Sequence, residues 1–229
     1  IKIFSNMIIG KGLIATQFAE VDSDKVLFFA SGVSNSSETD PSQFMREQKL
    51  IEETIEQYPN LFFVYFSTCS IYDSSKYNSP YVLHKLHMEE IIKEKANSYL
   101  ILRVSNAVGK GGNPNLLMNY LYRQFKNQEV LTIHQFATRN LIDVEDVKNI
   151  ALSYIQHNKK NQIVNVAYTE NFHIPEIIDA FEKVFGGKAK VNLEPKGEHY
   201  SIDLSELAYR FEITNKTDYL ENLIKKYYG

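Results

Sequence analysis

Cysteine is nearly absent from this sequence of 229 residues, where it occurs once, at Cys69. A single cysteine excludes an internal disulfide framework of the kind that stabilises small secreted domains. Long apolar runs are absent too, and none reaches the length of a transmembrane helix or of the hydrophobic part of a signal peptide. We therefore expect a cytoplasmic protein without a membrane partner.

The sequence also has no excess of basic residues. Its net charge is -3, and residues of both signs are interspersed, so it lacks the basic stripe that neutralises a phosphate backbone. We expect no nucleic acid partner. The composition, with 44% hydrophobic and 23% charged residues, is ordinary for a globular protein, and the length suits one cooperative unit with at most a small cap.

Short runs rich in β-branched and aromatic residues alternate with segments of helical periodicity. The runs that predict buried strands cover residues 1–9, 25–30, 61–67, 99–104 and 162–167, and the clearest helical segments cover residues 41–58 and 80–95. This alternation predicts an α/β fold with right-handed crossovers: a doubly wound, mostly parallel sheet of the Rossmann type.

This pattern predicts that the chain is organised in two regions. Residues 1–168 form a Rossmann-type cofactor-binding core, and residues 109–139 contribute to the cap after a glycine-rich turn that begins at Gly109. Residues 169–229 form a small substrate-binding lobe. In that lobe we expect a helix over 175–185, a short strand over 190–193, and helices that begin near Asp203 and Thr217.

A glycine loop follows the first predicted strand. Residues 10–15 read Gly-Lys-Gly-Leu-Ile-Ala, which is the pattern G-x-G-x-x-A between a strand and a helix. Glycine allows a tight turn and a close backbone approach, and a helix N-terminus offers free N–H groups to a pyrophosphate. The pattern alone is equally compatible with a simple strand-to-helix turn.

An acidic residue for the adenosine ribose is missing. Dinucleotide sites normally place Asp or Glu about 20 residues further on, at the end of a second strand. Only residues 13–29 separate Gly12 from Ala30, so the usual intervening βα units have no room. Asp22 and Asp24 lie in a short predicted loop, where solvated turn residues are the favoured interpretation. The region that normally selects NAD or NADP is thus absent.

Tyr81 and Lys85 are four residues apart at the start of a predicted helix, and so lie on one helix face. An ammonium near the phenol lowers its pKa, and a poised phenol can transfer a proton at a carbonyl or alcohol carbon. Thr68 or Ser67, at the end of the preceding strand, can hydrogen-bond to the same substrate oxygen. A nicotinamide would exchange the hydride.

These motifs resemble the extended short-chain dehydrogenase/reductases, the NAD-dependent epimerase/dehydratase family that mostly acts on nucleotide sugars. The resemblance also includes residues 102–109, 139–147 and 203–205. It implies Thr68, four residues before Tyr72, as the catalytic hydroxyl beside Tyr81 and Lys85. The implied ligands of NAD or NADP are Gly10, Gly12, Leu13, Ile14, Ala30, Ser31, Gly32 and Lys85, and those of a nucleotide-sugar substrate are Ser34, Asn106 and Arg139.

The resemblance further implies an NAD(P)-dependent reductase or epimerase that forms a homodimer. Cys69 and Ser70 stand where members that eliminate water carry an acidic pair, which disfavours a 4,6-dehydratase. Only residues 69–80 separate Thr68 from Tyr81, so the loop that shapes the pocket is trimmed. The alternative function is a non-catalytic Rossmann-fold ligand-binding or regulatory protein that has lost tight dinucleotide binding.

Several of these residues also have purely structural interpretations. Asn106 can be a satisfied strand-end amide, and Arg139 can pair with Asp143 or Asp146. Cys69 is interpreted as a small buried side chain rather than a nucleophile. His84 and His87 lack the companions of a metal site, so we expect no metal.

Overall fold

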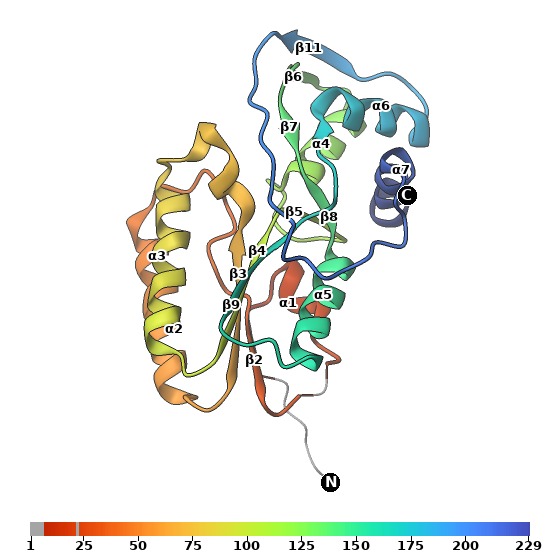
Figure 1. Ribbon diagram of the computed structural model, residues 1–229. Coiled ribbons are helices and arrows are strands. Elements are labelled where there is room, and N and C mark those ends of the chain that lie inside the picture. The colour runs from red at the N-terminus through yellow and green to blue at the C-terminus, as the bar shows by residue number, and fades with distance from the viewer. Residues whose placement is uncertain (1–6, 22) are drawn as a thin grey trace.

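The computed structural model describes residues 7–21 and 23–229, and it contains a five-stranded central sheet (Figure 1). The strands are β1 (Met7–Ile9), β2 (Val26–Phe29), β3 (Phe62–Thr68), β4 (Tyr99–Val104) and β9 (Gln162–Val166). Their order is β1-β2-β3-β4-β9, and every neighbouring pair is parallel. The predicted Rossmann-like sheet is confirmed; residues 1–6 of the first predicted strand, and Asp22, lie outside the described residues.

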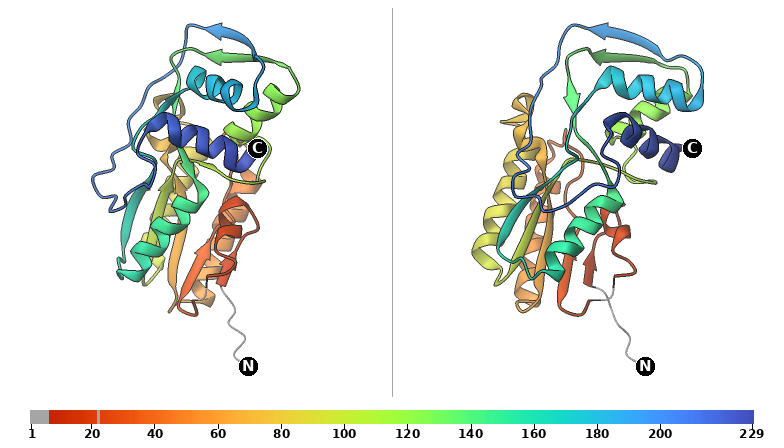
Figure 2. Two further views of the ribbon diagram at one scale, coloured as in Figure 1. Left: turned by 90° about the vertical axis from the view of Figure 1, so that its right-hand side faces the viewer. Right: turned by 45° about the vertical axis from the view of Figure 1, so that its right-hand side comes forward.

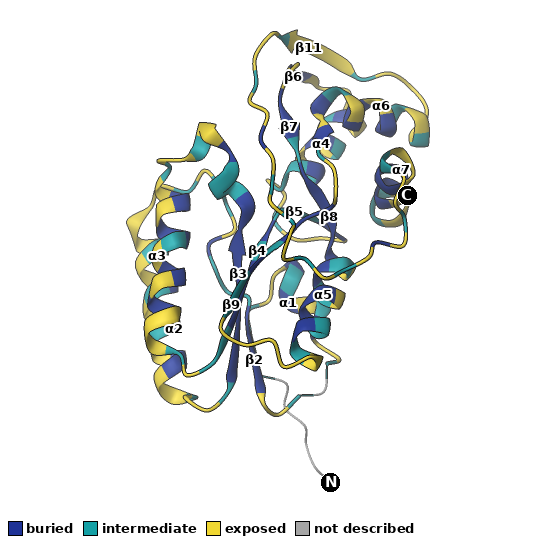
Figure 3. Ribbon diagram, viewed as in Figure 1, coloured by how far each residue is buried: buried dark blue, intermediate teal, exposed yellow. Residues whose placement is uncertain are grey.

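Helices cover both faces of the sheet. Helices α1 (Leu13–Gln17) and α5 (Val144–Gln156) lie on one face, and α2 (Pro41–Gln57) and α3 (Pro80–Lys95) lie on the other (Figure 1). Alternate residues of β2 point to the two sides: Phe28 packs in the cluster with α5, and Leu27 in the cluster with α2 and α3. The central strands β2 and β3 are accordingly buried along their whole length and mostly apolar, while the helices expose their outer faces (Figure 3).

The order of the strands differs from that of a complete doubly wound sheet. It advances in one direction from β1 to β9, although the connecting helices lie on opposite faces. The crossovers through α1 and α5 therefore have the opposite hand from those through α2 and α3, so the expectation of uniformly right-handed crossovers is wrong for one of these pairs. Among the described residues β1 pairs only with β2, which makes it an edge strand.

The remaining elements form a lobe beyond the carboxyl ends of the sheet strands (Figures 1 and 2). Its three two-stranded sheets pair β5 (Asn106–Val108) with β8 (Leu141–Asp143), β6 (Val130–His134) with β11 (Lys190–Glu194), and β7 (Thr138–Arg139) with β10 (Phe172–His173). Its helices are α4 (Leu117–Lys126), α6 (Ile174–Phe185) and α7 (Lys216–Tyr228). One hydrophobic cluster runs from Val64 in β3 to Phe181 and Leu223 in the lobe.

One expectation for the lobe is wrong. Residues near Asp203 form no helix, because the Asp203 carboxylate accepts a hydrogen bond from the Ser205 N–H at 2.9 Å in a local turn. The helix expected near Thr217 is present as α7, which begins at Lys216; its N-cap is Asn215, whose side chain accepts from the N–H of Asp218. None of the helices in the described part of the chain is long and apolar enough to cross a membrane.

The first glycine of the loop after β1 is needed for the backbone conformation. Gly10 has φ of +129°, and a Cβ there would lie 2.3 Å from the carbonyl oxygen of Ala30 at the end of β2. We expect Gly10→Ala to lower the free energy of unfolding by about 2 kcal/mol, as measured by urea denaturation.

Gly12→Ala is the matched control for this prediction. Gly12 has φ of -80°, and its added Cβ would meet no atom within 4 Å. Its substitution should change stability by less than about 1 kcal/mol. Equal stability of the two variants would contradict the close packing of Gly10 on Ala30.

Candidate functional site

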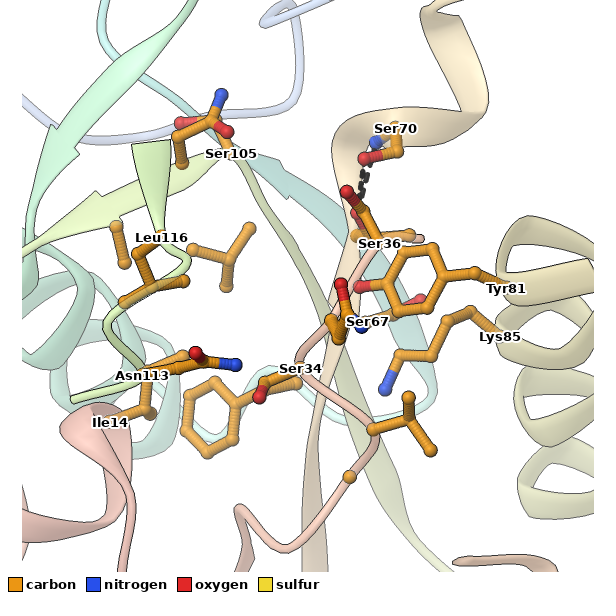
Figure 4. A pocket seen from close by; sticks show the side chains of 18 of the residues that line it. Ile14, Ser34, Ser36, Ser67, Ser70, Tyr81, Lys85, Ser105, Asn113 and Leu116 are labelled. Carbon is orange, nitrogen blue, oxygen red and sulfur yellow. Dashed lines mark hydrogen bonds between the residues drawn. The ribbon is translucent and has the colours of Figure 1, made fainter. Parts of the chain in front are cut away.

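A cavity of about 820 Å³ lies at the carboxyl ends of the sheet strands, between the core and the lobe (Figure 4). This is where ligands bind in open parallel α/β sheets. The cavity brings together almost all of the predicted site residues: Gly12, Leu13, Ile14, Ala30, Ser31, Gly32, Ser34, Thr68, Tyr81, Lys85, Asn106 and Arg139. Gly10 is not in the lining; it lets the glycine loop pack against the end of β2.

The glycine loop presents backbone to the cavity at Gly12. No atom would lie within 4 Å of a Cβ at Gly12, so the space beside it is open for the close approach of a ligand. Helix α1 has only five residues, so its dipole is shorter than that of the helix in a usual dinucleotide site. The loop and the segment from Ala30 to Gly32 fit a diphosphate and the nicotinamide end of a dinucleotide.

The adenosine end of such a site is incomplete. Asp73 is the only acidic residue among the described residues that line the cavity, and it lies after β3, far along the chain from the glycine loop. Asp24 is exposed in the loop before β2. The residue that reaches Ser31 is a cation: Arg46 of α2 donates to the Ser31 carbonyl oxygen at 3.1 Å. The described lining thus supplies no carboxylate for an adenosine ribose.

Two predicted catalytic groups come from β3 and α3. Thr68 ends β3, and its hydroxyl oxygen accepts a hydrogen bond from the Ser70 N–H at 3.0 Å. Tyr81 stands in the first turn of α3, which Ser79 caps and Pro80 begins. The neighbouring hydroxyl of Ser67, which also lines the cavity, donates to the buried carboxylate of Glu89 at 2.6 Å, so its proton is already engaged.

The Lys85 ammonium is held by a partner that the sequence patterns did not reveal. Its side chain is only 2% exposed, and Nζ lies 3.1 Å from Oε1 of Glu47 and 4.5 Å from the centre of the Tyr65 ring. Figure 4 shows Lys85 and Tyr81 both entering the cavity from α3. The ammonium is thus directed to a carboxylate, whereas the spacing predicted that it would serve the Tyr81 phenol.

Glu47 lies in the middle of α2 and is fully buried. Besides Lys85, its two oxygens lie close to three other groups: the N–H of Val33 at 2.7 Å, the Tyr65 hydroxyl at 2.6 Å and Nε2 of His84 at 3.0 Å. Burial raises the pKa of Glu47, but the charge of Lys85 and these hydrogen bonds outweigh it and hold the pKa well below its usual range.

The spacing of Glu47 from apolar residues could have identified it as a buried carboxylate. Glu47 is four residues before Ile51 and eight before Ile55, so it lies on the apolar face of α2. A carboxylate on such a face requires buried partners. We define Glu47, Tyr65, His84 and Lys85 as the Glu47 cluster.

Gly32 makes room for the Glu47 cluster. A Cβ at Gly32 would lie 2.7 Å from Oε1 of Glu47 and 2.8 Å from Nζ of Lys85. The absence of a side chain at this position therefore serves the buried ion pair, in addition to the cofactor role implied for Gly32.

Arg139 pairs with neither of the two carboxylates that the sequence suggested. Its guanidinium lies 3.7 Å from Oδ2 of Asp73 and donates to the Thr138 carbonyl oxygen at 2.7 Å. Asp143 instead accepts from Lys226 at 2.8 Å, and Asp146 accepts from Tyr209 and Tyr219.

Asn106 lines the cavity while its side-chain amide donates to the Asn140 carbonyl oxygen at 2.7 Å. Its NH₂ group is therefore engaged at the strand end, as the structural interpretation expects. Cys69 is buried as expected, and its Sγ lies 2.9 Å from the Arg103 carbonyl oxygen. Burial raises the pKa of the Cys69 thiol to about 12, so it is protonated and unreactive at neutral pH.

Comparison with known proteins places this geometry in a family. The chain matches the NAD dependent epimerase/dehydratase family over residues 8–167. No curated protein sequence matches significantly. Solved structures with a similar fold include UDP-glucuronic acid 4-epimerase from Bacillus cereus in complex with NAD, with 20% identity, a TM-score of 0.72 and coverage of 94% of this chain and 78% of that chain.

Two further similar structures carry related ligands. MoeE5 in complex with UDP-glucose and NAD is 16% identical, with a TM-score of 0.74 and coverage of 88% of this chain and 78% of that one. RMD from Pseudomonas aeruginosa complexed with NADPH is 15% identical, with a TM-score of 0.72 and coverage of 91% and 82%. At such identities the likeness shows the fold, and the family match covers most of the chain. The protein belongs to the NAD-dependent epimerase/dehydratase family.

Proposed function

We propose that the protein is an NAD(P)-dependent epimerase or reductase that acts on a nucleotide-linked sugar. The observation that carries this proposal is the cavity that Thr68 and Tyr81 line together with the glycine loop. Similar folds solved with UDP-glucuronic acid or UDP-glucose together with NAD support the substrate class. Cys69 and Ser70, which follow Thr68, provide no carboxylate for the elimination of water.

In this proposal the nicotinamide, when bound, supplies or accepts the hydride. Thr68 hydrogen-bonds to the reacting sugar oxygen, and Tyr81 takes or gives its proton. Lys85, held by Glu47, would contact the nicotinamide ribose. Ser34, Asn106 and Arg139 hold the sugar nucleotide, the guanidinium through phosphate oxygens.

A second candidate function is a ligand-binding or regulatory protein without turnover. Within the described residues, the edge position of β1 and the lack of a lining carboxylate near the glycine loop favour it, because both remove contacts that hold adenosine in a complete doubly wound sheet. The two candidates differ in whether a dinucleotide binds.

Calorimetry with NAD and NADP separates them. We expect one of the two to bind, with weak affinity because the adenosine end is incomplete. Failure of both at millimolar concentration would rule out the enzyme and leave the binding protein. Where a dinucleotide binds, turnover of a UDP-sugar without added NADH indicates an epimerase, and stoichiometric consumption of NADH indicates a reductase.

A further inference from the structure

Two cations meet at the lobe side of the cavity. Arg139 comes from β7, and Lys76 comes from a short 3-10 helix (Ser74–Lys76) in the trimmed loop between β3 and α3. Both line the cavity. Lys76 is half-buried, and its ammonium donates to the hydroxyl of Ser36, in the segment after β2, at 2.6 Å. Three separate segments of the chain thus build this end of the cavity.

The charge of this end is not balanced by the protein. Asp73 is the one acidic lining residue among those described, and its Oδ2 lies 3.7 Å from Arg139. Its Oδ1 accepts from the N–H and the hydroxyl of Ser75. Burial and the nearby Arg139 charge lower the pKa of Lys76, although Asp73 opposes them. Two positive charges therefore share one carboxylate.

Lys76 retains hydrogen-bonding capacity toward a ligand. An ammonium has three N–H donors, and the hydrogen bond to Ser36 uses one of them. Among the described residues no carboxylate lies within 4 Å of its nitrogen, in contrast to Lys85, whose ammonium Glu47 neutralises. An anion in the cavity would complete the coordination of Lys76.

The segment that carries Lys76 follows the proposed catalytic hydroxyl of Thr68 directly along the chain. The chain passes from Thr68 through consecutive 3-10 turns to Lys76, with hydrogen bonds from the Asp73 N–H to the Ser70 carbonyl oxygen at 3.2 Å and from the Lys76 N–H to the Asp73 carbonyl oxygen at 2.8 Å. These turns fix Lys76 relative to Thr68. Because Lys76 and Arg139 line the same cavity as Thr68 and Tyr81, an anionic group of a ligand whose sugar contacts Thr68 and Tyr81 can reach the two cations.

We propose that Lys76 and Arg139 form a two-cation subsite for an anionic oxygen group of the substrate, either the diphosphate or a carboxylate on the sugar. The inference rests on the proposed function for the identity of the substrate class. Lys76 is the new residue of this subsite, since Arg139 was already expected to bind the substrate. Lys76 comes from the short loop between β3 and α3.

Calorimetry of the full chain with UDP, UDP-glucose and UDP-glucuronic acid tests the subsite. The variant Lys76→Met removes the charge and keeps an unbranched side chain. We expect it to lose about 10- to 100-fold in affinity, the size of a hydrogen bond to a charged group. A loss common to all three ligands identifies the diphosphate as the bound group, and a loss confined to UDP-glucuronic acid identifies the carboxylate.

Two further variants control this experiment. Lys49→Met makes the same change of net charge on α2, where the side chain is 76% exposed and paired with Glu53; it should bind all three ligands as the wild type does. Lys76→Arg keeps the charge and should retain most of the affinity, which would show that a cation at this position is what the ligand requires.

Two outcomes would overturn the subsite. One is a Lys76→Met variant that binds all three ligands with wild-type affinity, and the other is a wild-type protein that binds none of them at millimolar concentration. Because the measurement needs no turnover, Lys76-dependent binding of UDP in a protein that never reacts would refute the proposed enzyme and leave the subsite standing.

Discussion

Replacing Tyr81 by Phe is expected to lower kcat about 10²- to 10⁴-fold, the usual contribution of a positioned general acid or base. The phenol oxygen is the only group that the substitution removes, and the ring remains in the buried wall that it shares with Val33 and Val82. Turnover of a UDP-sugar measures the loss. Calorimetry with UDP should show nearly unchanged affinity, because the proposed role of Tyr81 is the transfer of a proton.

Tyr77→Phe is the matched control. Tyr77 precedes α3 by three residues, and its side chain is 67% exposed. The same chemical change there should leave kcat unaltered. Undiminished turnover in Tyr81→Phe would remove Tyr81 from the reaction and would favour a binding protein or another proton donor in the cavity.

The parts of the fold that depend on local pattern were predictable from the sequence. Helix α3 begins at Pro80, as the Ser-Pro pair indicates, and the apolar runs correspond to the described sheet strands. The glycine loop was predictable as well, because the backbone at position 10 has a positive φ that favours glycine. These features depend on steric limits and burial within about ten residues, which periodicity reports directly.

Features that depend on distant partners were not predictable. Glu47 and Lys85 are 38 residues apart in the chain. Arg139 in β7 pairs with Asp73, which follows β3, so this pair is also distant in the sequence. The strands β6 and β11 pair in parallel, and the hydrophobic periodicity of each strand does not indicate its partner. The opposite hands of the crossovers likewise became evident only with the sheet order, since the short segment between β1 and β2 places β1 at the edge.

Lys85 was identified by its local spacing, but its distant partner was not predicted. Its spacing from Tyr81 identified it from the sequence, whereas the structure shows that the ammonium is balanced by Glu47 in a closed cluster. A buried charge with a fixed counter-ion has little freedom to move, so Lys85 is held in one place at the cavity wall. Its effect on the phenol of Tyr81 is therefore the net field of Lys85 and Glu47 together.

Glu47→Gln is expected to lower the free energy of unfolding by about 3–5 kcal/mol at neutral pH, because it leaves the ammonium of Lys85 buried without a counter-ion. Urea denaturation measures the change. The control is Glu53→Gln, on the same helix, which breaks an exposed pair with Lys49 and should cost about 0.5 kcal/mol or less. A small effect of Glu47→Gln would contradict the closed Glu47 cluster.

The difference between wild type and Glu47→Gln should also depend on pH in a definite direction. The pKa of Glu47 is depressed in the folded protein, whereas the unfolded chain has the ordinary value of about 4.3. The ionised carboxylate thus contributes its full stabilisation above about pH 5, and the contribution falls as the pH drops below the unfolded value toward the folded one. The two proteins should converge in stability on acidification. A difference that stays constant down to pH 3 would show that Glu47 acts through packing and hydrogen bonds rather than through its charge on Lys85.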